Sequence, residues 1–262
     1  MAGLELGGRR RRFLLIAVSI YALLCVGGIL LHSFLSSRSF ELRREQFIAL
    51  YLLELALMLF LAPLLSIRGI ILEKQDERLL QLLPDRKGAL RIALRSVAFP
   101  LFVAVILSLV PGLAALLVKA LFGGVPALVL IRASAVVMFM ALGAAAVGCY
   151  CSVRCADMFS SAGLALLFVI LLILEPIWLG PVIGSAPFLI QPSLLINPFA
   201  GLASAMDFDL FRTEPLYQIC PIGQLRFEYP AWWSVAVLYV SMTFLFLWRS
   251  VVGIRRMAEP SK

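Results

Sequence analysis

Long apolar stretches separated by short charged clusters run along the whole chain. Four of these stretches carry no charge at all: 13–37, 96–118, 133–153 and 229–248. Residues 158–174 form a shorter uncharged stretch, and 46–67 is interrupted only by Glu54. A helix needs about 20 mostly apolar residues to cross a bilayer. The pattern therefore predicts six membrane-spanning helices, over about residues 13–35, 46–67, 96–118, 126–150, 157–175 and 229–250.

Composition agrees with this pattern. Hydrophobic residues make up 62% of the sequence, charged residues only 15%, and the mean hydropathy is +1.01. Soluble domains carry about 25% charged residues, so the balance excludes a soluble enzyme and indicates an all-α integral membrane protein with a single transmembrane domain over 1–262. The net charge of +8 does not indicate nucleic-acid binding, because the basic residues fall between the apolar stretches.

The basic residues also indicate the orientation in the membrane. With the N-terminus in the cytoplasm, sixteen of the 23 Lys and Arg residues lie in cytoplasmic segments. Six spans then leave both termini in the cytoplasm. Arg9–Arg12 resemble the start of a signal peptide, but the apolar run after them is too long for one, so we expect a retained first helix.

Prolines recur in the long connection 176–228, which this topology places on the outer side. No continuous helix can run through its uncharged part, because prolines stand at 176, 181, 187, 192 and 198. A re-entrant or interfacial excursion of short helices fits better than a seventh crossing. At the turn that leads to the last span we expect Asn197, Pro198 and Phe199. We expect the remainder, 207–228, to be a polar external loop.

The cytoplasmic segment 68–95 combines mostly charged residues at 73–78 with leucines at 79, 80, 82 and 83. The charged part requires water, whereas the leucines require a partner surface or the bilayer interface. Pro84 ends the helical pattern. From the residues alone, the segment is either a solvated linker between two spans or a docking surface.

These features together resemble the permease subunits of ABC exporters of the ABC-2 type. Between their second and third helices, such permeases carry a pattern close to Arg-x-Ile-x-x-Glu-Arg-x-x-Gly-Thr-Leu followed by further leucines. Here Glu77 and Arg78 replace the Gly-Thr pair, and the matching residues are Arg68, Ile70, Glu73, Lys74, Leu79, Leu82 and Leu83. Two later stretches also resemble the family: 196–202, with its Asn-Pro-Phe, and the last span with its terminal arginines, 229–257.

The resemblance implies a half-transporter of the inner (cytoplasmic) membrane, paired with a second permease subunit and docked on a separate ABC ATPase subunit. The residues implied in coupling to that ATPase are Arg68, Glu73, Lys74, Glu77, Leu79, Leu82 and Leu83. The sequence contains no G-x-x-x-x-G-K-[ST] loop, so we expect this chain not to be an enzyme, with ATP and Mg bound by the partner subunit. The alternative is a structural or assembly subunit of another membrane complex.

Glu54 and Arg132 are charges inside predicted spans. Such charges are costly and are usually paired or functional. Both helices run inward, and at 1.5 Å per residue both side chains lie roughly 10 Å below the outer surface, so we expect a hydrogen-bonded pair. The alternatives are a polar lining of the substrate path and snorkelling to the interface. No deep row of charge crosses the spans, which favours a lipid-like or amphipathic cargo over a simple ion.

Three cysteines, Cys149, Cys151 and Cys155, lie at the inner end of the fourth predicted span. Three soft ligands can bind copper or zinc, but no histidine is near and helical spacing spreads these side chains around the helix axis. We therefore expect no metal site.

Reporter fusions after residues 40, 85, 122, 155 and 215 test the predicted topology. We expect them to report outside, inside, outside, inside and outside in turn, because successive fusion points are separated by one span. An inside signal at 215 would mean that the proline-rich connection crosses the membrane.

Overall fold

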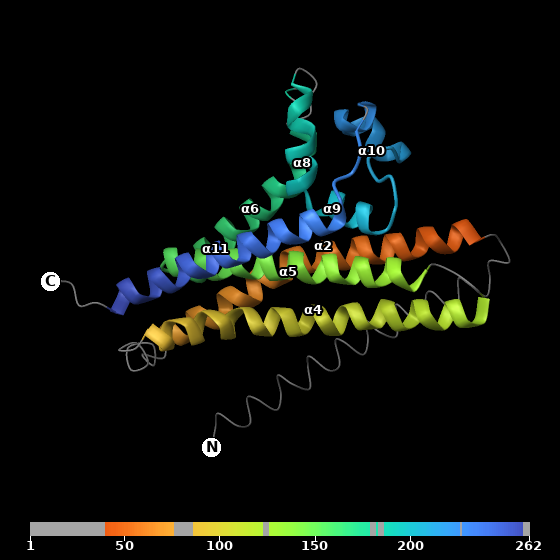
Figure 1. Cartoon of the computed structure of the whole chain (residues 1–262). Helices are drawn as coiled ribbons and strands as arrows, with labels where there is room; N and C mark the ends of the chain where they lie inside the picture. Colours follow the sequence, from red (N-terminus) through yellow and green to blue (C-terminus); the bar gives the residue numbers. More distant parts are fainter. Residues whose placement is uncertain are drawn as a thin grey trace.

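The computed structural model describes residues 40–75, 86–122, 126–178, 182, 186–225 and 227–258. Long helices make up most of this part: α2 (Phe40–Gln75), α4 (Arg86–Phe122), α5 (Ala127–Arg154), α6 (Met158–Trp178) and α11 (Trp232–Ala258) (Figure 1). Short elements lie between the last two: η1 (Pro187–Leu189), α8 (Ile190–Ile196), α9 (Pro198–Ala205), α10 (Glu214–Ile219) and η2 (Pro221–Gln224). No strand occurs in the described ranges.

The five long helices are each long and apolar enough to cross a membrane. Their apolar parts are Phe47–Ile71, Gly88–Leu109, Ala127–Arg154, Met158–Ile177 and Trp232–Met257. The predicted all-helical, multi-pass membrane protein is therefore confirmed. The predicted first span, 13–35, lies outside the described residues, so the sixth helix and the cytoplasmic position of both termini stay predictions.

The helix ends differ from the predicted boundaries. α2 continues from the predicted span 46–67 to Gln75, and α4 begins at Arg86, well before its predicted start. The predicted connection 68–95 is therefore helical on both sides of 76–85, which lie outside the described residues. The length of an apolar stretch matches the thickness of the bilayer. A helix, in contrast, ends where its backbone hydrogen bonds end, and charged residues do not interrupt those bonds.

The two extensions pack against each other. Ile70 near the end of α2 is fully buried, as are Ala89 and Ala93 near the start of α4. A Cβ on Gly69 would lie 3.6 Å from the Cα of Ser96, so the two backbones approach closely here. α2 and α4 thus continue as one packed pair beyond the predicted end of the span.

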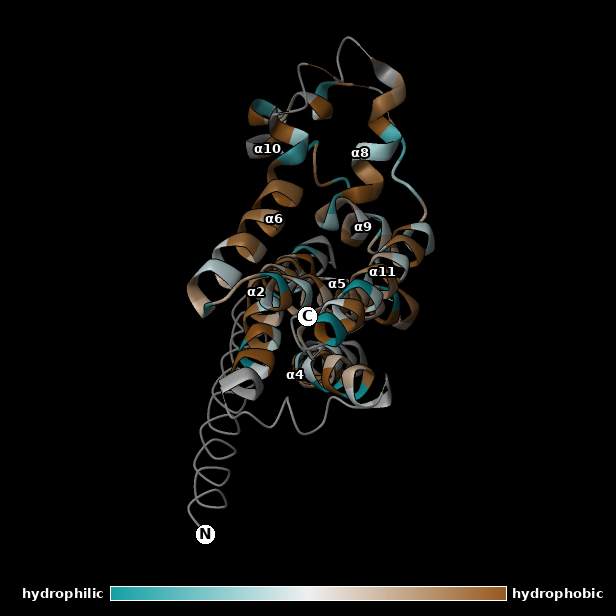
Figure 2. Ribbon diagram, turned by 90° about the vertical axis from the view of Figure 1, so that its left-hand side faces the viewer, coloured by the Kyte–Doolittle hydropathy of each residue, from teal (hydrophilic) through white to brown (hydrophobic). Residues whose placement is uncertain are grey.

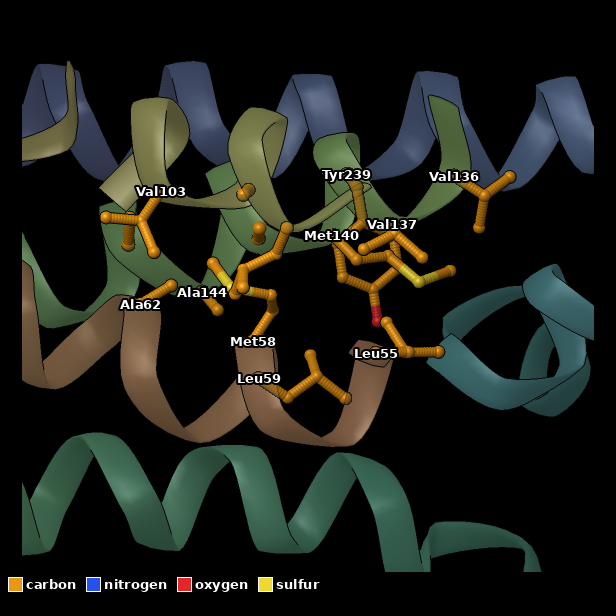
Figure 3. Close-up of a cluster of buried hydrophobic side chains, with 14 of the residues drawn as sticks. Leu55, Met58, Leu59, Ala62, Val103, Val136, Val137, Met140, Ala144 and Tyr239 are labelled. Carbon is orange, nitrogen blue, oxygen red and sulfur yellow. The ribbon is translucent and has the colours of Figure 1, made fainter. Parts of the chain in front are cut away.

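α5 is the centre of the bundle and packs against α2, α4, α6, α9 and α11. Figure 2 shows it between α2 and α11, with α4 beneath. α2, α5 and α11 run in one direction and α4 and α6 in the other, as helices that cross a bilayer in turn must do (Figure 1). Figure 3 shows part of the apolar core where four of them meet: Leu55, Met58, Leu59 and Ala62 of α2, Val103 of α4, Val136, Val137, Met140 and Ala144 of α5, and Tyr239 of α11.

Small residues on α5 allow this close packing. A Cβ on Gly148 would lie 2.6 Å from the Cα of Pro63 in α2, and one on Gly143 would lie 2.9 Å from Cδ1 of Tyr239 in α11. Real Cβ atoms do not approach other atoms so closely. Helices in lipid associate through such close contacts, because the surrounding lipid is as apolar as the side chains and gives no hydrophobic driving force.

The change Gly148→Ala tests the contact between α5 and α2. The added methyl group would overlap the backbone of Pro63, which cannot rotate away, so we expect thermal unfolding in mild detergent to show a loss of about 1–3 kcal/mol. Gly163→Ala on α6 is the matched control, because nothing lies within 4 Å of its Cβ position. The control should be neutral or stabilised by up to about 1 kcal/mol through helix propensity. Equal unfolding midpoints for the two variants would contradict this packing.

Candidate functional site

A helix break at Asn197 separates α8 from α9, and α10 and η2 follow before the last long helix begins at Trp232. The backbone of Asn197 is extended (φ -73°, ψ 123°), whereas the residues on both sides are helical. Pro198 explains the break, because the residue before a proline is driven out of the helical region and proline suits the first position of a helix. The break predicted at Asn197, Pro198 and Phe199 is therefore present, while its location on the outer side stays a prediction.

The side-chain amide of Asn197 bonds to backbone groups of two helices. Its Oδ1 accepts from the N–H groups of Phe199 (3.0 Å) and Ala200 (3.1 Å), which caps the start of α9. Its Nδ2 donates to the carbonyl oxygens of Leu172 (3.1 Å) and Ile173 (3.4 Å) in α6. Asn197 is 1% exposed, so these bonds form away from water.

The bond to Leu172 compensates for a proline in α6. In a regular helix the carbonyl of Leu172 accepts from the N–H of residue 176, but Pro176 has no N–H. Leaving a buried carbonyl without a donor costs about 1–3 kcal/mol. Nδ2 of Asn197 supplies the missing donor, so one amide satisfies both the irregular turn of α6 and the first turn of α9.

Two further hydrogen bonds hold the break in place. Tyr239 of α11 donates its hydroxyl to the carbonyl oxygen of Ile196, the last residue of α8 (2.8 Å). Ser193 of α8 donates to Oε2 of Glu175 in α6 (2.7 Å). The break is thus tied to α6 on one side and α11 on the other, and Figure 1 shows α8 standing away from the bundle while α9 lies beside it. We call this arrangement the Asn197 junction.

The segment after α9 is a folded cap, so the prediction of a polar external loop over 207–228 is wrong. Residues of this segment form a small apolar cluster with α8 and α9: Ile190, Leu194, Ala200, Phe211, Cys220 and Ile222. The thiol of Cys220 also donates to the carbonyl oxygen of Pro176 (3.4 Å). These apolar residues have no regular spacing in the sequence, so only the tertiary structure brings them together.

Tyr229 joins the cap to the start of the last helix. Its hydroxyl accepts from the N–H of Phe211 (3.0 Å) and donates to Oδ1 of Asp209 (3.0 Å). Arg212 forms an ion pair with Asp209 (2.9 Å) and lies 5.1 Å from the centre of the Phe227 ring. Burial raises the pKa of Tyr229, and the negative charge of Asp209 adds to the shift, so the phenol stays protonated and remains a donor.

Glu54 lies inside the bundle and is fully buried. Ser108 of α4 donates its hydroxyl to Oε1 of Glu54, whereas Oε2 has no hydrogen-bond partner in the described part of the chain. One turn earlier, the hydroxyl of Tyr51 lies 3.0 Å from Oγ of Ser134 and 3.5 Å from the carbonyl oxygen of Leu130, both in α5. These polar side chains sit within the otherwise apolar core, and we call them the buried acid cluster: Tyr51, Glu54, Ser108 and Ser134.

The expected hydrogen-bonded pair of Glu54 and Arg132 does not form, so that prediction is wrong. Glu54 and Arg132 do lie at a similar depth along their helices. Tyr51, one turn before Glu54, contacts Leu130 and Ser134, which lie on either side of Arg132. Rotation about the helix axis separates the two charges: Glu54 bonds to α4, whereas Arg132 is partly exposed. Because Glu54 is fully buried, it also does not line a water-filled path in this conformation.

The residues implied in ATPase coupling lie at the end of α2 and beyond it. Arg68 is exposed, and Glu73 and Lys74 belong to the last turn of α2. The others lie outside the described residues: Glu77, Leu79, Leu82 and Leu83.

Cys149 and Cys151 are buried in α5, and Cys155 follows the end of that helix. In the part of the chain that the structure describes, no three His, Cys, Asp or Glu side chains are placed to hold a metal ion. The buried cysteines act as small apolar residues in the core.

Sequence reasoning missed the partners of the two polar sites. A single Ser or Tyr in an apolar span carries no signal of what it contacts, so Ser108, Ser193 and Tyr239 could not be assigned. Pro176 did carry a signal, because a proline inside a helix always leaves the carbonyl four residues earlier without its donor. Which side chain supplies the donor depends on the packing of α8 against α6.

A double-mutant cycle tests the role of Asn197. Asn197→Ala removes the cap of α9 and the donor to Leu172, and we expect it to cost about 2–3 kcal/mol in thermal unfolding. In a Pro176→Ala background residue 176 has an N–H for Leu172, so the same change should cost about 1 kcal/mol less. An equal cost in both backgrounds would contradict the link between the proline and the amide.

A comparison with protein-family models gives no match, and a comparison with curated proteins gives none either.

Proposed function

We propose that this chain is the transmembrane subunit of an ATP-driven ABC exporter of the ABC-2 type. In this proposal two such subunits pair in the inner (cytoplasmic) membrane, and each docks on a separate ABC ATPase subunit. The chain itself carries no nucleotide, and ATP and Mg belong to the partner. The cargo that fits best is lipid-like or amphipathic, since the spans carry no continuous row of charge.

The observation that carries the proposal is the helix break before the last span. The resemblance places an Asn-Pro-Phe turn before the last span, and in this chain hydrogen bonds tie that turn to α6 and α11. A re-entrant element held in this way is suited to gating the outer end of a pathway. The alternating directions of the five long helices are also compatible with a permease.

The packing of α2 and α4 supports the mechanical part of the proposal. Their extensions beyond the predicted spans place Ile70, Ala89 and Ala93 in the buried core, and the backbones approach closely at Gly69 and Ser96. A partner that pushes on 76–85 would therefore move both helices together, and the tight contact of Pro63 with Gly148 would transmit the movement to α5. ATP would drive the cycle through its different affinity for the two states of the complex.

The double change Leu79→Asp and Leu82→Asp tests this proposal. Charged residues at these positions should prevent burial of the leucines against an ATPase, so we expect loss of copurification with an ATPase subunit and loss of ATP-coupled transport, with membrane insertion unchanged. Affinity purification in mild detergent with identification of the bound chains is the measurement.

Met257→Asp is the matched control, because it places an acid on an exposed apolar side chain at the end of α11, on the same predicted side of the membrane. The control should keep its ATPase partner. Copurification of wild-type protein with a different membrane complex and no ATPase would favour the structural-subunit alternative and contradict the proposal.

A further inference from the structure

The two oxygens of the Glu54 carboxyl differ in their surroundings. Oε1 accepts a hydrogen bond from Ser108, whereas Oε2 is buried and finds no partner among the residues that the structure describes. An ionised carboxylate spreads its negative charge over both oxygens and requires donors at each, because no water reaches them. One serine hydroxyl satisfies only half of that requirement.

Among the residues that the structure describes, the elements packed around Glu54 supply no compensating positive charge. On α2, Tyr51 lies one turn away and carries no charge at neutral pH. Residues 96–118 of α4 contain no ionisable side chain, nor do residues 158–174 of α6 or any residue of α9. On α5 the cation at this level is Arg132, which does not pair with Glu54. A buried charge without a partner is strongly unfavourable.

We propose that Glu54 is a proton-binding site whose carboxyl carries a proton on Oε2 at neutral pH while α2, α4 and α5 are packed together. A proton cancels the charge that the surroundings leave uncompensated, and unlike a metal ion or a small molecule it requires no cavity. The site does not depend on the function proposed above, since it rests only on the burial and bonding of one side chain.

Release of this proton converts the carboxylic acid into a carboxylate, and the proton passes to water. Water has to reach Oε2 for that step, so α4 has to separate from α2 at the contact of Ser108 with Glu54. Opening of the bundle and loss of the proton are therefore linked. Low pH favours the packed state, and rising pH favours any conformation that hydrates this contact.

Thermal unfolding of wild-type protein and Glu54→Gln in detergent, between about pH 5 and about pH 7, tests the proton site. Glutamine resembles the protonated acid in shape but cannot titrate. Above about pH 4.3 an unfolded Glu is ionised, so the folded wild-type chain binds one proton more than the unfolded chain. The stabilisation that this extra proton gives the folded wild-type chain is therefore largest at low pH and is lost as pH rises. Relative to Glu54→Gln, we expect its unfolding constant to increase up to about tenfold per pH unit.

Glu45→Gln is the matched control, because Glu45 is an exposed acid at the other end of α2 from the coupling segment. This variant should follow the wild type at every pH. Infrared spectroscopy at neutral pH gives a second measurement: a protonated-carboxyl band should be present in wild-type protein and Glu45→Gln and absent in Glu54→Gln. Parallel pH curves for the wild type and Glu54→Gln, or no such band in the wild type, would overturn the proposal.

Discussion

The requirement that every backbone polar group finds a partner in an apolar setting governs the region where α6, α8 and α9 meet. α6 contains a proline near its end and the chain breaks again at Asn197, so two sets of backbone groups lose their helical partners. Water is not available to satisfy groups buried in this way. The side-chain amide of Asn197 satisfies both sets: its oxygen accepts from the first turn of α9, and its nitrogen donates to the open carbonyl of α6. The position of α8 and α9 relative to α6 depends on these bonds.

Two prolines mark sites where neighbouring helices contact each other. Pro176 leaves the carbonyl of Leu172 open to Asn197, and Pro63 of α2 meets Gly148 of α5 with almost no space between the backbones. In each case a residue outside the helix packs against the turn that contains the proline. Asn197 hydrogen-bonds to the turn at Pro176, and Gly148 has no side chain to keep α5 away from the turn at Pro63. Both contacts are specific, because lipid gives the helices no general reason to associate.

The bundle therefore connects its two ends through α5. At one end α2 and α4 extend as a packed pair toward 76–85, and at the other α9 lies against α5 and α11. The buried acid cluster lies between them, at the junction of α2, α4 and α5. A movement of the α2–α4 pair relative to α5 would change this cluster before it reached the Asn197 junction.

The sequence by itself determined the membrane class, the identity of the five long helices that the structure describes, and the helix break at Asn197. These follow from local causes: hydrophobic length and the effect of proline on the preceding residue. The extent of α2 and α4 beyond the apolar stretches, the folded cap after α9 and the partners of Glu54 were decided only by the tertiary structure. Depth along a helix can be counted from the sequence, and the counted depths of Glu54 and Arg132 agree. Rotation cannot be counted, because it is set by which small side chains let two helices approach, and that rotation directed Glu54 to Ser108.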